Sequence, residues 1–594
     1  MAETMKGLKR THYCGEVNNT LVGKEVVVCG WVQKIRDKGM LVFIDLRDRS
    51  GIIQLAFDDA TAQQLREKAQ TVRSEYVLAA RGLVKTRESV NKDIANGDVE
   101  IYVSELRILS KAATPPFEIT DKSNVKEELR LKNRYLDLRR RPLQQNIMLR
   151  HRIAQVTRNY FYENGFLEIE TPMMIKSTPE GARDYIVPSR VHPGSFYALP
   201  QSPQIYKQLL MLSGFDRYIQ LARCFRDEDL RADRQPEFTQ IDLEMSFVDV
   251  DDVLEMVEGF VSRLFHEVMG REIPMPLTRL TFAEAMNRYG SDKPDTRFSM
   301  ELCDLSDLAA GSAFPVFADA IANGGTVRGI VAKGAADKLT RKEIDKLTET
   351  ARGIGAKGLA YVRWVDDAPS CSFGKFMAEG ELTKLLERLD CQKGDVALIV
   401  ADRTSLALSV LGSLRNILGR QLGLIDPDKF NFLWIVEFPF FEKDEESGQW
   451  VAMHHPFTMP MEECLEFLDT DPGKVRAKAY DLVLNGVELC SGSIRISDYQ
   501  LQEKMFASLG LTKEQIEAKF GFLVDAYHYG APPHGGVGIG LDRLVMTMTG
   551  AESLRDVVAF PKVQNASELM SGCPSPVDQK SLDELHIATV TKPE

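Results

Sequence analysis

The chain has 594 residues, too many for a single hydrophobic core, which indicates several domains. A composition of 44% hydrophobic and 27% charged residues is ordinary for a globular protein. The net charge of −12 does not by itself indicate a nucleic-acid-binding protein. No apolar run approaches the roughly 18 residues of a membrane span. The nine cysteines include no C-x-x-C pair and residues 1–14 do not read as a signal peptide, so we expect a cytoplasmic protein with reduced thiols.

Residues 1–112 predict a small β-barrel. About five short runs rich in β-branched residues are separated by turns, one of them at Lys38, a pattern that suggests a closed barrel of the OB type. In the strand 41–48, alternation turns Phe43 away from the buried face. An outward aromatic ring near basic Arg36 resembles a platform for stacking nucleic-acid bases. A phenylalanine covered by a loop or a neighbouring domain explains the pattern equally well.

The rest of the chain predicts a domain built from two separated segments. Residues 113–140 begin with a polar, proline-bearing stretch and are expected to form a linker. Residues 141–288 start with apolar residues at helical spacing and continue with strand patterns. Residues 289–424 alternate strands and helices, contain none of the motifs described below, and are expected to form an inserted domain. Strand patterns return in 425–594, so this segment is expected to complete the domain begun at 141–288.

Two segments indicate a nucleotide site. Residues 224–247 predict two strands joined by a charged loop with Arg231 and Arg234, a pattern suited to clamping a polyphosphate, although a salt-bridged surface hairpin is the commoner explanation. Residues 534–544 place several glycines before Arg543 at the start of a predicted helix. Glycines let backbone approach a ligand, and a guanidinium at a helix start can pair with phosphate. Since no G-x-x-x-x-G-K-[ST] occurs, this is not a P-loop.

Three motifs in this order resemble the signatures of the class II aminoacyl-tRNA synthetases. Residues 165–172 (GFLEIETP) resemble motif 1, residues 225–228 (FRDE) the start of motif 2, and residues 540–543 (GLDR) motif 3. Each motif alone is weak. The ordered set, behind an OB-type barrel, is typical of subclass IIb, which comprises the aspartyl, asparaginyl and lysyl enzymes, and the resemblance covers essentially the whole chain.

Further segments resemble the bacterial-type aspartyl members of that subclass. Residues 201–208 (QSPQIYKQ) resemble their substrate loop, and residues 177–185 (STPEGARDY) resemble their mobile lid. Residues 486–496 (GVELCSGSIRI) resemble the strand that carries a metal-binding glutamate and a substrate-binding arginine. The insertion at 289–424 is similar to the extra domain of the bacterial-type enzymes, and we assign it no catalytic role.

The resemblance implies an α+β multidomain fold. It consists of an N-terminal OB-type barrel that binds the anticodon, a class II antiparallel sheet with flanking helices, and an inserted α+β domain. The implied reaction joins L-aspartate to tRNA(Asp) through an aspartyl-adenylate, with ATP and Mg²⁺, in a homodimer. No protein nucleophile is required, because the α-carboxylate of the amino acid attacks the α-phosphate while the enzyme aligns the groups and neutralises charge. Whether tRNA(Asn) is also charged stays open, because Lys38 in the barrel does not indicate whether the enzyme is specific for tRNA(Asp) or accepts both tRNAs.

The resemblance also assigns residues to subsites. The residues expected to act in catalysis are Arg226, Glu228 and Arg543. Those expected to bind ATP are Arg226, Asp227, Glu228, Gln235, Glu488, Gly540, Leu541, Asp542 and Arg543. Those expected to bind aspartate are Glu180, Gln204, Lys207, Arg226, Asp242, His454 and Arg495. The carboxylates Asp481 and Glu488 suit Mg²⁺, and the anticodon is expected to meet Arg36, Lys38, Phe43 and Gln54.

Two alternatives stay open. An asparaginyl enzyme would share the motifs and the barrel, but it would not be expected to pair Lys207 with Arg495 over the side chain of its amino acid. A catalytically inactive tRNA-binding paralogue would share the fold, and the intact motif residues argue against it.

Overall fold

The computed structural model describes residues 3–178, 182–444, 448–509 and 512–590. The chain forms two compact units, Met1–Met148 with Ser567–Ser575 and Leu149–Ala566 with Pro576–Glu594. Among the described residues, no helix is long and apolar enough to cross a bilayer. The nine cysteines, all within the described ranges, are free thiols, as predicted.

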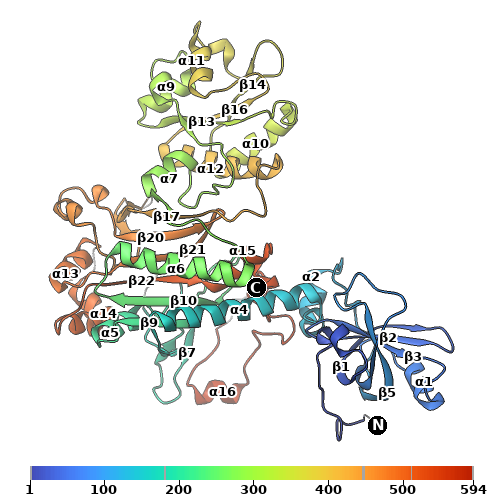
Figure 1. Ribbon diagram of the computed structural model, residues 1–594. Helices are drawn as coiled ribbons and strands as arrows, with labels where there is room; N and C mark the ends of the chain where they lie inside the picture. Colours follow the sequence, from blue (N-terminus) through green and yellow to red (C-terminus); the bar gives the residue numbers. More distant parts are fainter. Residues whose placement is uncertain (1–2, 179–181, 445–447, 510–511, 591–594) are drawn as a thin grey trace. The chain divides into compact units, whose positions relative to one another are not determined.

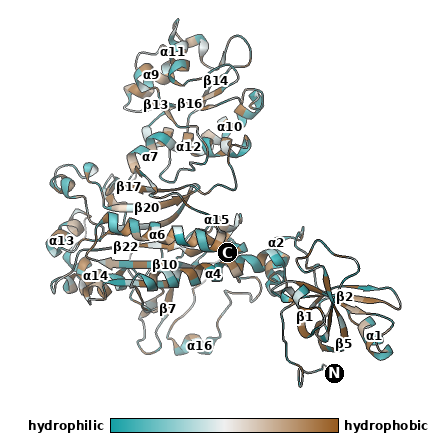
Figure 2. Ribbon diagram, in the orientation of Figure 1, coloured by the Kyte–Doolittle hydropathy of each residue, from teal (hydrophilic) through white to brown (hydrophobic). Residues whose placement is uncertain are grey.

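The first unit contains the predicted OB-type barrel. Five strands close in the order β1-β2-β3-β5-β4, antiparallel except for the parallel β3–β5 pair. Brown, hydrophobic residues run along β1 and β5 in Figure 2. The side chain of Val42 is fully buried in the barrel core, whereas Phe43 is partly exposed on the outer face, as the alternation predicts. The elements are β1 (Glu25–Asp37), β2 (Val42–Arg47), β3 (Ile52–Phe57), α1 (Gln63–Gln70), β4 (Val77–Thr86) and β5 (Val99–Ser110).

The segment 113–140 has structure of its own. It contains the short helices α2 (Glu127–Lys132) and α3 (Arg134–Asp137), and Phe117 and Leu136 share a small apolar cluster. The segment therefore joins the barrel to the rest of the chain without being a plain flexible linker. The predicted domain boundaries stay a prediction.

The second unit is built on an eight-stranded sheet, drawn in Figure 1. Its order is β11-β17-β20-β21-β22-β10-β9-β6, and all neighbours are antiparallel except the two edge pairs, β11–β17 and β6–β9. The main core lies between this sheet and the helices α4, α6 and α15. The strands are β6 (Leu167–Glu168), β9 (Arg217–Phe225), β10 (Glu237–Ser246), β11 (Thr278–Thr281), β17 (Phe432–Val436), β20 (Ala479–Leu484), β21 (Val487–Ile494) and β22 (His534–Gly540).

The helices of this domain begin and end where capping chemistry predicts. In α6, Asp249 and Asp252 form a capping box at the start, and Gly270 ends the helix in the left-handed region with a φ of 64°. The helices are α4 (Arg141–Glu163), α5 (Gln204–Leu212), α6 (Val250–Met269), α7 (Phe282–Tyr289), α13 (Tyr499–Ser508), α14 (Lys513–Tyr527), α15 (Leu541–Thr549) and α16 (Gln579–Glu584). Two small hairpins pair β7 (Ile186–Pro188) with β8 (Phe196–Ala198) and β18 (Phe441–Lys443) with β19 (Trp450–Ala452).

The inserted segment forms its own antiparallel sheet, in the order β12-β13-β16-β14-β15. It has hydrophobic clusters on both faces of this sheet, which is why it can be accommodated between two halves of another domain. Its elements are β12 (Cys303–Asp304), α8 (Ser306–Ala309), α9 (Pro315–Ala322), β13 (Thr326–Ala332), α10 (Arg341–Ile354), β14 (Ala360–Arg363), β15 (Ser370–Cys371), α11 (Glu381–Arg388), β16 (Val396–Asp402) and α12 (Thr404–Gln421).

The glycines of β22 correct one expectation. A Cβ at Gly536 would lie 2.1 Å from the carbonyl oxygen of Leu243 on β10, so this glycine is required by the close approach of two strands. The expectation that it lets a ligand approach is therefore wrong for Gly536. Gly538 and Gly540 do line the cavity described next.

Candidate active site

A cavity of about 450 Å³ lies in the second unit, where β10, β21 and β22 meet α5 and the loop between β9 and β10. The cavity brings together residues that are far apart in the sequence, because strands from distant parts of the chain lie side by side in the sheet. The predicted ATP- and aspartate-binding residues that line it are Gln204, Lys207, Arg226, Glu228, Gln235, Asp242, His454, Glu488, Arg495, Gly540, Asp542 and Arg543.

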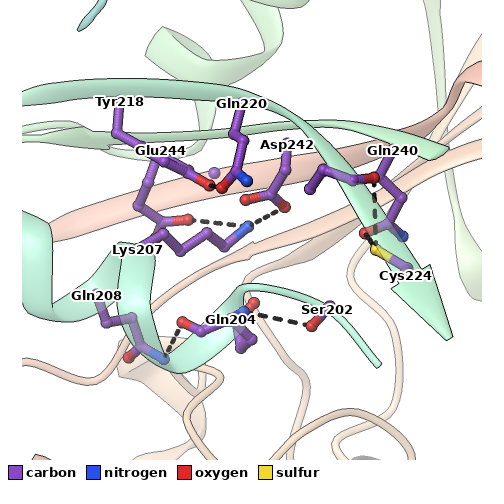
Figure 3. Close-up of polar contacts among 12 residues, drawn as sticks. Ser202, Gln204, Lys207, Gln208, Tyr218, Gln220, Cys224, Gln240, Asp242 and Glu244 are labelled. Carbon is purple, nitrogen blue, oxygen red and sulfur yellow. Dashed lines mark hydrogen bonds and ion pairs between the residues drawn. The ribbon is translucent and has the colours of Figure 1, made fainter. Parts of the chain in front are cut away.

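Four buried charged side chains, Lys207, Asp242, Glu244 and Arg495, form what we term the charge cluster. Lys207 Nζ lies 2.9 Å from Asp242 Oδ1 and 3.3 Å from Glu244 Oε2, as Figure 3 shows. Arg495 grips Glu244 with two parallel bonds, Nε to Oε1 at 2.9 Å and Nη2 to Oε2 at 3.1 Å. Two cations and two anions thus balance one another in the absence of a ligand.

The two acids of the charge cluster differ in how their surroundings act on them. Burial raises the pKa of Asp242, and the nearby Lys207 offsets this only in part. Burial also opposes ionisation of Glu244, but Arg495 and Lys207 outweigh it and hold its pKa below the usual value. Asp242 Oδ2 accepts no hydrogen bond from the described part of the chain, so it is the acceptor that a ligand ammonium group would find.

Two adjacent histidines line the cavity together. A strand would have turned His454 and His455 to opposite faces, but they follow β19 in irregular backbone, which lets both line the cavity. Burial lowers the pKa of His454 to about 4. Burial, followed by the charge of Arg495, lowers the pKa of His455 well below its usual value. His455 Nε2 accepts from Arg495 Nη1 at 2.6 Å, so the remaining proton of the neutral ring is on Nδ1.

The other end of the cavity carries the guanidinium groups expected to meet phosphate. Arg226 lies over the ring of Phe238, 5.0 Å from its centre, and its buried Nε has no partner among the described residues. Arg543 donates to the backbone oxygen of Glu488 at 3.2 Å and contacts the carboxylate of Asp233 at 3.3 Å. Both guanidinium groups line the cavity, where an anionic ligand could pair with them.

Gln235 and Glu228, which are predicted to bind ATP, both have hydrogen-bond partners in the chain. The Gln235 amide donates to the Lys562 carbonyl at 3.0 Å and accepts from the Lys562 backbone at 2.8 Å. Glu228 accepts from Arg234 at 2.9 Å. The aromatic face of Phe238 also lines the cavity and suits a purine ring.

Asp481 and Glu488 lie on neighbouring strands beside the phosphate end. Burial, together with the charge of Glu488, raises the pKa of Asp481 well above its usual value, and its Oδ1 has no hydrogen-bond partner in the described structure. A buried, unpaired carboxylate oxygen next to a second carboxylate fits a divalent cation. Within the described ranges, no group of three or more His, Cys, Asp or Glu side chains could hold a metal, so phosphate oxygens and water would have to supply the other ligands.

Three predicted site residues, Asp227, Leu541 and Asp481, are not among those that line the cavity. Asp227 contacts Arg183 at 3.5 Å outside the cavity. Leu541 is buried in the main core, and although Asp542 reaches the cavity, its Oδ2 accepts from the backbone of Thr239 at 3.0 Å, which is a role in the fold. Asp481 pairs in register with Ser491, which does line the cavity. Glu180 lies outside the described residues.

The barrel residues form a separate cluster on the outer face of the first unit. Arg36 donates two hydrogen bonds to the carboxylate of Asp45, from Nη2 at 2.7 Å and from Nη1 at 3.0 Å, and one from Nη2 to Gln54 Oε1 at 2.7 Å. In register, Phe43 lies directly opposite Arg36 on the neighbouring strand, and Lys38 is exposed in the turn between these strands. The structure thus brings the four predicted anticodon-binding residues to one region of the barrel.

The sequence patterns did not predict Glu244, a member of the charge cluster, or His455, which contacts Arg495 of that cluster. Glu244 follows Asp242 by two positions on β10, so strand alternation would have placed both on one face. His455 carried no usable signal, because its position depends on irregular backbone.

The chain matches the model of tRNA synthetases class II (D, K and N) over residues 126–564 and that of the OB-fold nucleic acid binding domain over residues 26–109. It is 58% identical to the aspartate--tRNA ligase of Ruminiclostridium cellulolyticum, with 99% of each chain covered. It is 56% identical to the aspartate--tRNA(Asp/Asn) ligase of Caldanaerobacter subterraneus subsp. tengcongensis, again with 99% of each covered.

Solved structures agree at the level of the fold. The aspartyl-tRNA synthetase of Entamoeba histolytica has a TM-score of 0.57 at 20% identity, covering 93% of this chain and 92% of that one. The asparaginyl-tRNA synthetase of Pyrococcus horikoshii has a TM-score of 0.57 at 18% identity, covering 93% and 98%. With the family model matching more than half of the chain and full-length relatives above half identity, the chain belongs to the class II aminoacyl-tRNA synthetases of the aspartyl, lysyl and asparaginyl family.

Proposed function

We propose that this protein attaches L-aspartate to tRNA(Asp) through an aspartyl-adenylate. The observation that carries the proposal is the charge cluster: Lys207 and Arg495 present donors and positive charge at the buried end of the cavity, and Asp242 presents an unpaired oxygen beside them. This arrangement suits an amino acid with a carboxylate side chain. The names of the relatives at 58% and 56% identity support the same substrate.

The geometry suggests how the first step would proceed. The aspartate side chain takes hydrogen bonds from Lys207 and Arg495, and its ammonium group donates to Asp242. This holds the α-carboxylate toward Arg226, between the amino-acid end and the phosphate end of the cavity. Arg226 and Arg543 neutralise charge on the phosphates as the α-carboxylate attacks the α-phosphate and pyrophosphate leaves. The terminal ribose hydroxyl of tRNA then takes the aspartyl group.

Mg²⁺ belongs to the proposal because Asp481 and Glu488 fit it. When bound, the ion would neutralise charge on the phosphate oxygens. The chain's own contribution is to hold two carboxylates on adjacent strands, where burial first and the charge of Glu488 second raise the pKa of Asp481.

The test is amino-acid-dependent ATP–pyrophosphate exchange across all amino acids. We expect exchange with aspartate alone, and with Lys207→Met a weaker reaction and a narrower preference for aspartate over asparagine. Exchange with asparagine in place of aspartate would overturn the proposal in favour of an asparaginyl enzyme. No exchange with any amino acid would favour an inactive paralogue.

A second acceptor, tRNA(Asn), is favoured by the names of two similar proteins, both called aspartate--tRNA(Asp/Asn) ligase. We infer that this chain also attaches aspartate to tRNA(Asn), and that it works in the cytoplasm, where these tRNAs are used. Charging of purified tRNA(Asn) with labelled aspartate tests the inference, and charging confined to tRNA(Asp) would refute it.

We infer that the enzyme is a homodimer. The edge strand β6 is only two residues long, with Leu167 50% exposed, and Tyr162 on the adjoining helix α4 is 80% exposed. An exposed edge with large apolar side chains is a surface that another chain can cover. Sedimentation should give a dimer for the wild type and a monomer for Leu167→Asp, and an unchanged dimer in the variant would exclude this edge.

A further inference from the structure

The first residues of the inserted region reach the phosphate end of the active site. Lys293 Nζ lies 3.6 Å from Glu488 Oε2 and 3.6 Å from Asp292 Oδ1. Neither Asp292 nor Lys293 belongs to a signature motif. Lys293 therefore places a positive charge beside Glu488, one of the two carboxylates expected to hold Mg²⁺.

The backbone that follows Lys293 is held by packing and by a hydrogen bond. Asp295 is buried and packs against Gly486, in the turn between β20 and β21, where a Cβ on the glycine would lie 3.1 Å from the Cβ of Asp295. Asn431 donates to the carbonyl of Thr296 at 3.0 Å. The loop is thus attached to the turn that joins the strands of Asp481 and Glu488, and to the residue that precedes β17.

The inserted domain holds the same loop from the other side. Arg415 of α12 is 1% exposed and donates through Nη2 to the carbonyls of Asp295 and Phe298, each at 2.9 Å. Its guanidinium lies over the rings of Phe298 and Tyr289, at 4.1 and 5.0 Å from their centres. The loop that carries Lys293 is therefore held by the catalytic domain and by the inserted domain. The Lys293 side chain is 46% exposed, so it can change partner.

We propose that Lys293 is an ATP-binding residue: its ammonium group pairs with Glu488, and when substrate is bound it contacts the phosphate tail of ATP and then pyrophosphate. A divalent cation at Glu488 would repel an ammonium group 3.6 Å from the same carboxylate. The ammonium must then move, and the new anion beside it is the phosphate tail. Lysine suits this exchange because its charge is compact and its stem is flexible. The inference rests on the proposed function only in that the cavity must bind ATP.

The test is calorimetric titration of the full chain with Mg-ATP, Mg-pyrophosphate and adenosine, without tRNA or amino acid. We expect Lys293→Ala to weaken Mg-ATP and Mg-pyrophosphate about tenfold, equivalent to ~1.4 kcal/mol, with adenosine unchanged. Lys293→Arg should retain most of the affinity, because the positive charge remains. Lys357→Ala is the matched control, since Lys357 is an exposed lysine in the same inserted region.

Two results would overturn the inference. Affinities of Lys293→Ala within twofold of the wild type for both phosphate ligands would show that the lysine only pairs with Glu488. An equal loss for adenosine would show that the substitution distorts the cavity. Wild-type protein that binds no ATP would instead remove the proposed function, so the two failures are distinguishable.

Discussion

Arg495→Leu is the perturbation with the largest expected effect, and its effect on folding must be separated from its effect on chemistry. Arg495 and Glu244 are both fully buried and joined by two charge-assisted bonds. Removing one partner of a buried ion pair costs about 3–5 kcal/mol, because the other charge stays buried. Lys207, 3.3 Å from Glu244, offsets part of this, so we expect a loss near the lower end of the range.

The double variant Arg495→Leu with Glu244→Met separates the two effects. Replacing both partners by apolar groups of similar shape is nearly neutral, and the Lys207–Asp242 pair stays intact and balanced. We expect the double variant to recover to within about 2 kcal/mol of the wild type while aspartate activation stays absent.

The assays are the urea midpoint of unfolding and aspartate-dependent ATP–pyrophosphate exchange at saturating ATP. The midpoint is preferred because a chain with several domains need not unfold in two states. A double variant no more stable than Arg495→Leu would refute the pairing argument. A double variant that activates aspartate at the wild-type rate would show that the side-chain carboxylate binds elsewhere.

The remaining predictions concern the barrel, the phosphates, pH and the metal. Phe43→Ala should weaken tRNA charging through the loss of roughly 1–3 kcal/mol of stacking, with exchange unchanged; a parallel fall in both would make Phe43 a structural residue. Arg226→Ala and Arg543→Ala should each abolish exchange in folded protein, and wild-type exchange would remove that arginine from the site. Since burial lowers the pKa of His454 from 6.5 to about 4, the unfolded state takes up its proton first. Relative to His454→Gln, the wild type should therefore lose about 1 kcal/mol of stability per pH unit between about pH 6.5 and 4 and nothing above it, and parallel urea–pH curves would contradict this. Asp481→Asn should raise the Mg²⁺ needed for half-maximal exchange without lowering the urea midpoint, and an unchanged Mg²⁺ requirement would exclude Asp481 as a ligand.

The parts of the fold predicted from sequence are those that depend on local patterns. The alternation in strand 41–48 predicted which side of β2 is buried, and the helical spacing near Leu149 predicted α4. The large sheet was not predictable from local signals, because β10 pairs with β22, which lies almost three hundred residues later. Its architecture came from the resemblance to a family.

The site followed the same division. The motifs predicted Arg226 and Arg543, which line the cavity, but they did not predict the side chains that these arginines contact, Phe238 and Asp233. Glu244 and Arg495 are 251 positions apart, and only the completed sheet places them in contact. Lys293 was not predicted from the sequence, for a related reason. Its loop is placed by contacts with Gly486, between β20 and β21, and with Asn431, just before β17, and nothing in the neighbouring sequence indicates a phosphate site.

The charge cluster also suggests why asparagine would be a poor substrate although it has nearly the shape of aspartate. The cluster is balanced before the ligand arrives, so discrimination cannot rest on net charge alone and must depend on donors and acceptors. Lys207 and Arg495 carry only donors. The free oxygen of Asp242 is expected to accept from the ammonium group of the amino acid, and Glu244 is already paired with Arg495 and Lys207. His455 would be the remaining acceptor nearby, but its Nε2 already accepts from Arg495, and burial lowers its pKa, so the ring is neutral with the proton on Nδ1. The histidine therefore adds a donor. An asparagine amide NH₂ in this position would meet donors, whereas a carboxylate accepts from all of them, and sites built on such pairing reject the unpaired analogue by factors of about 10⁴–10⁵.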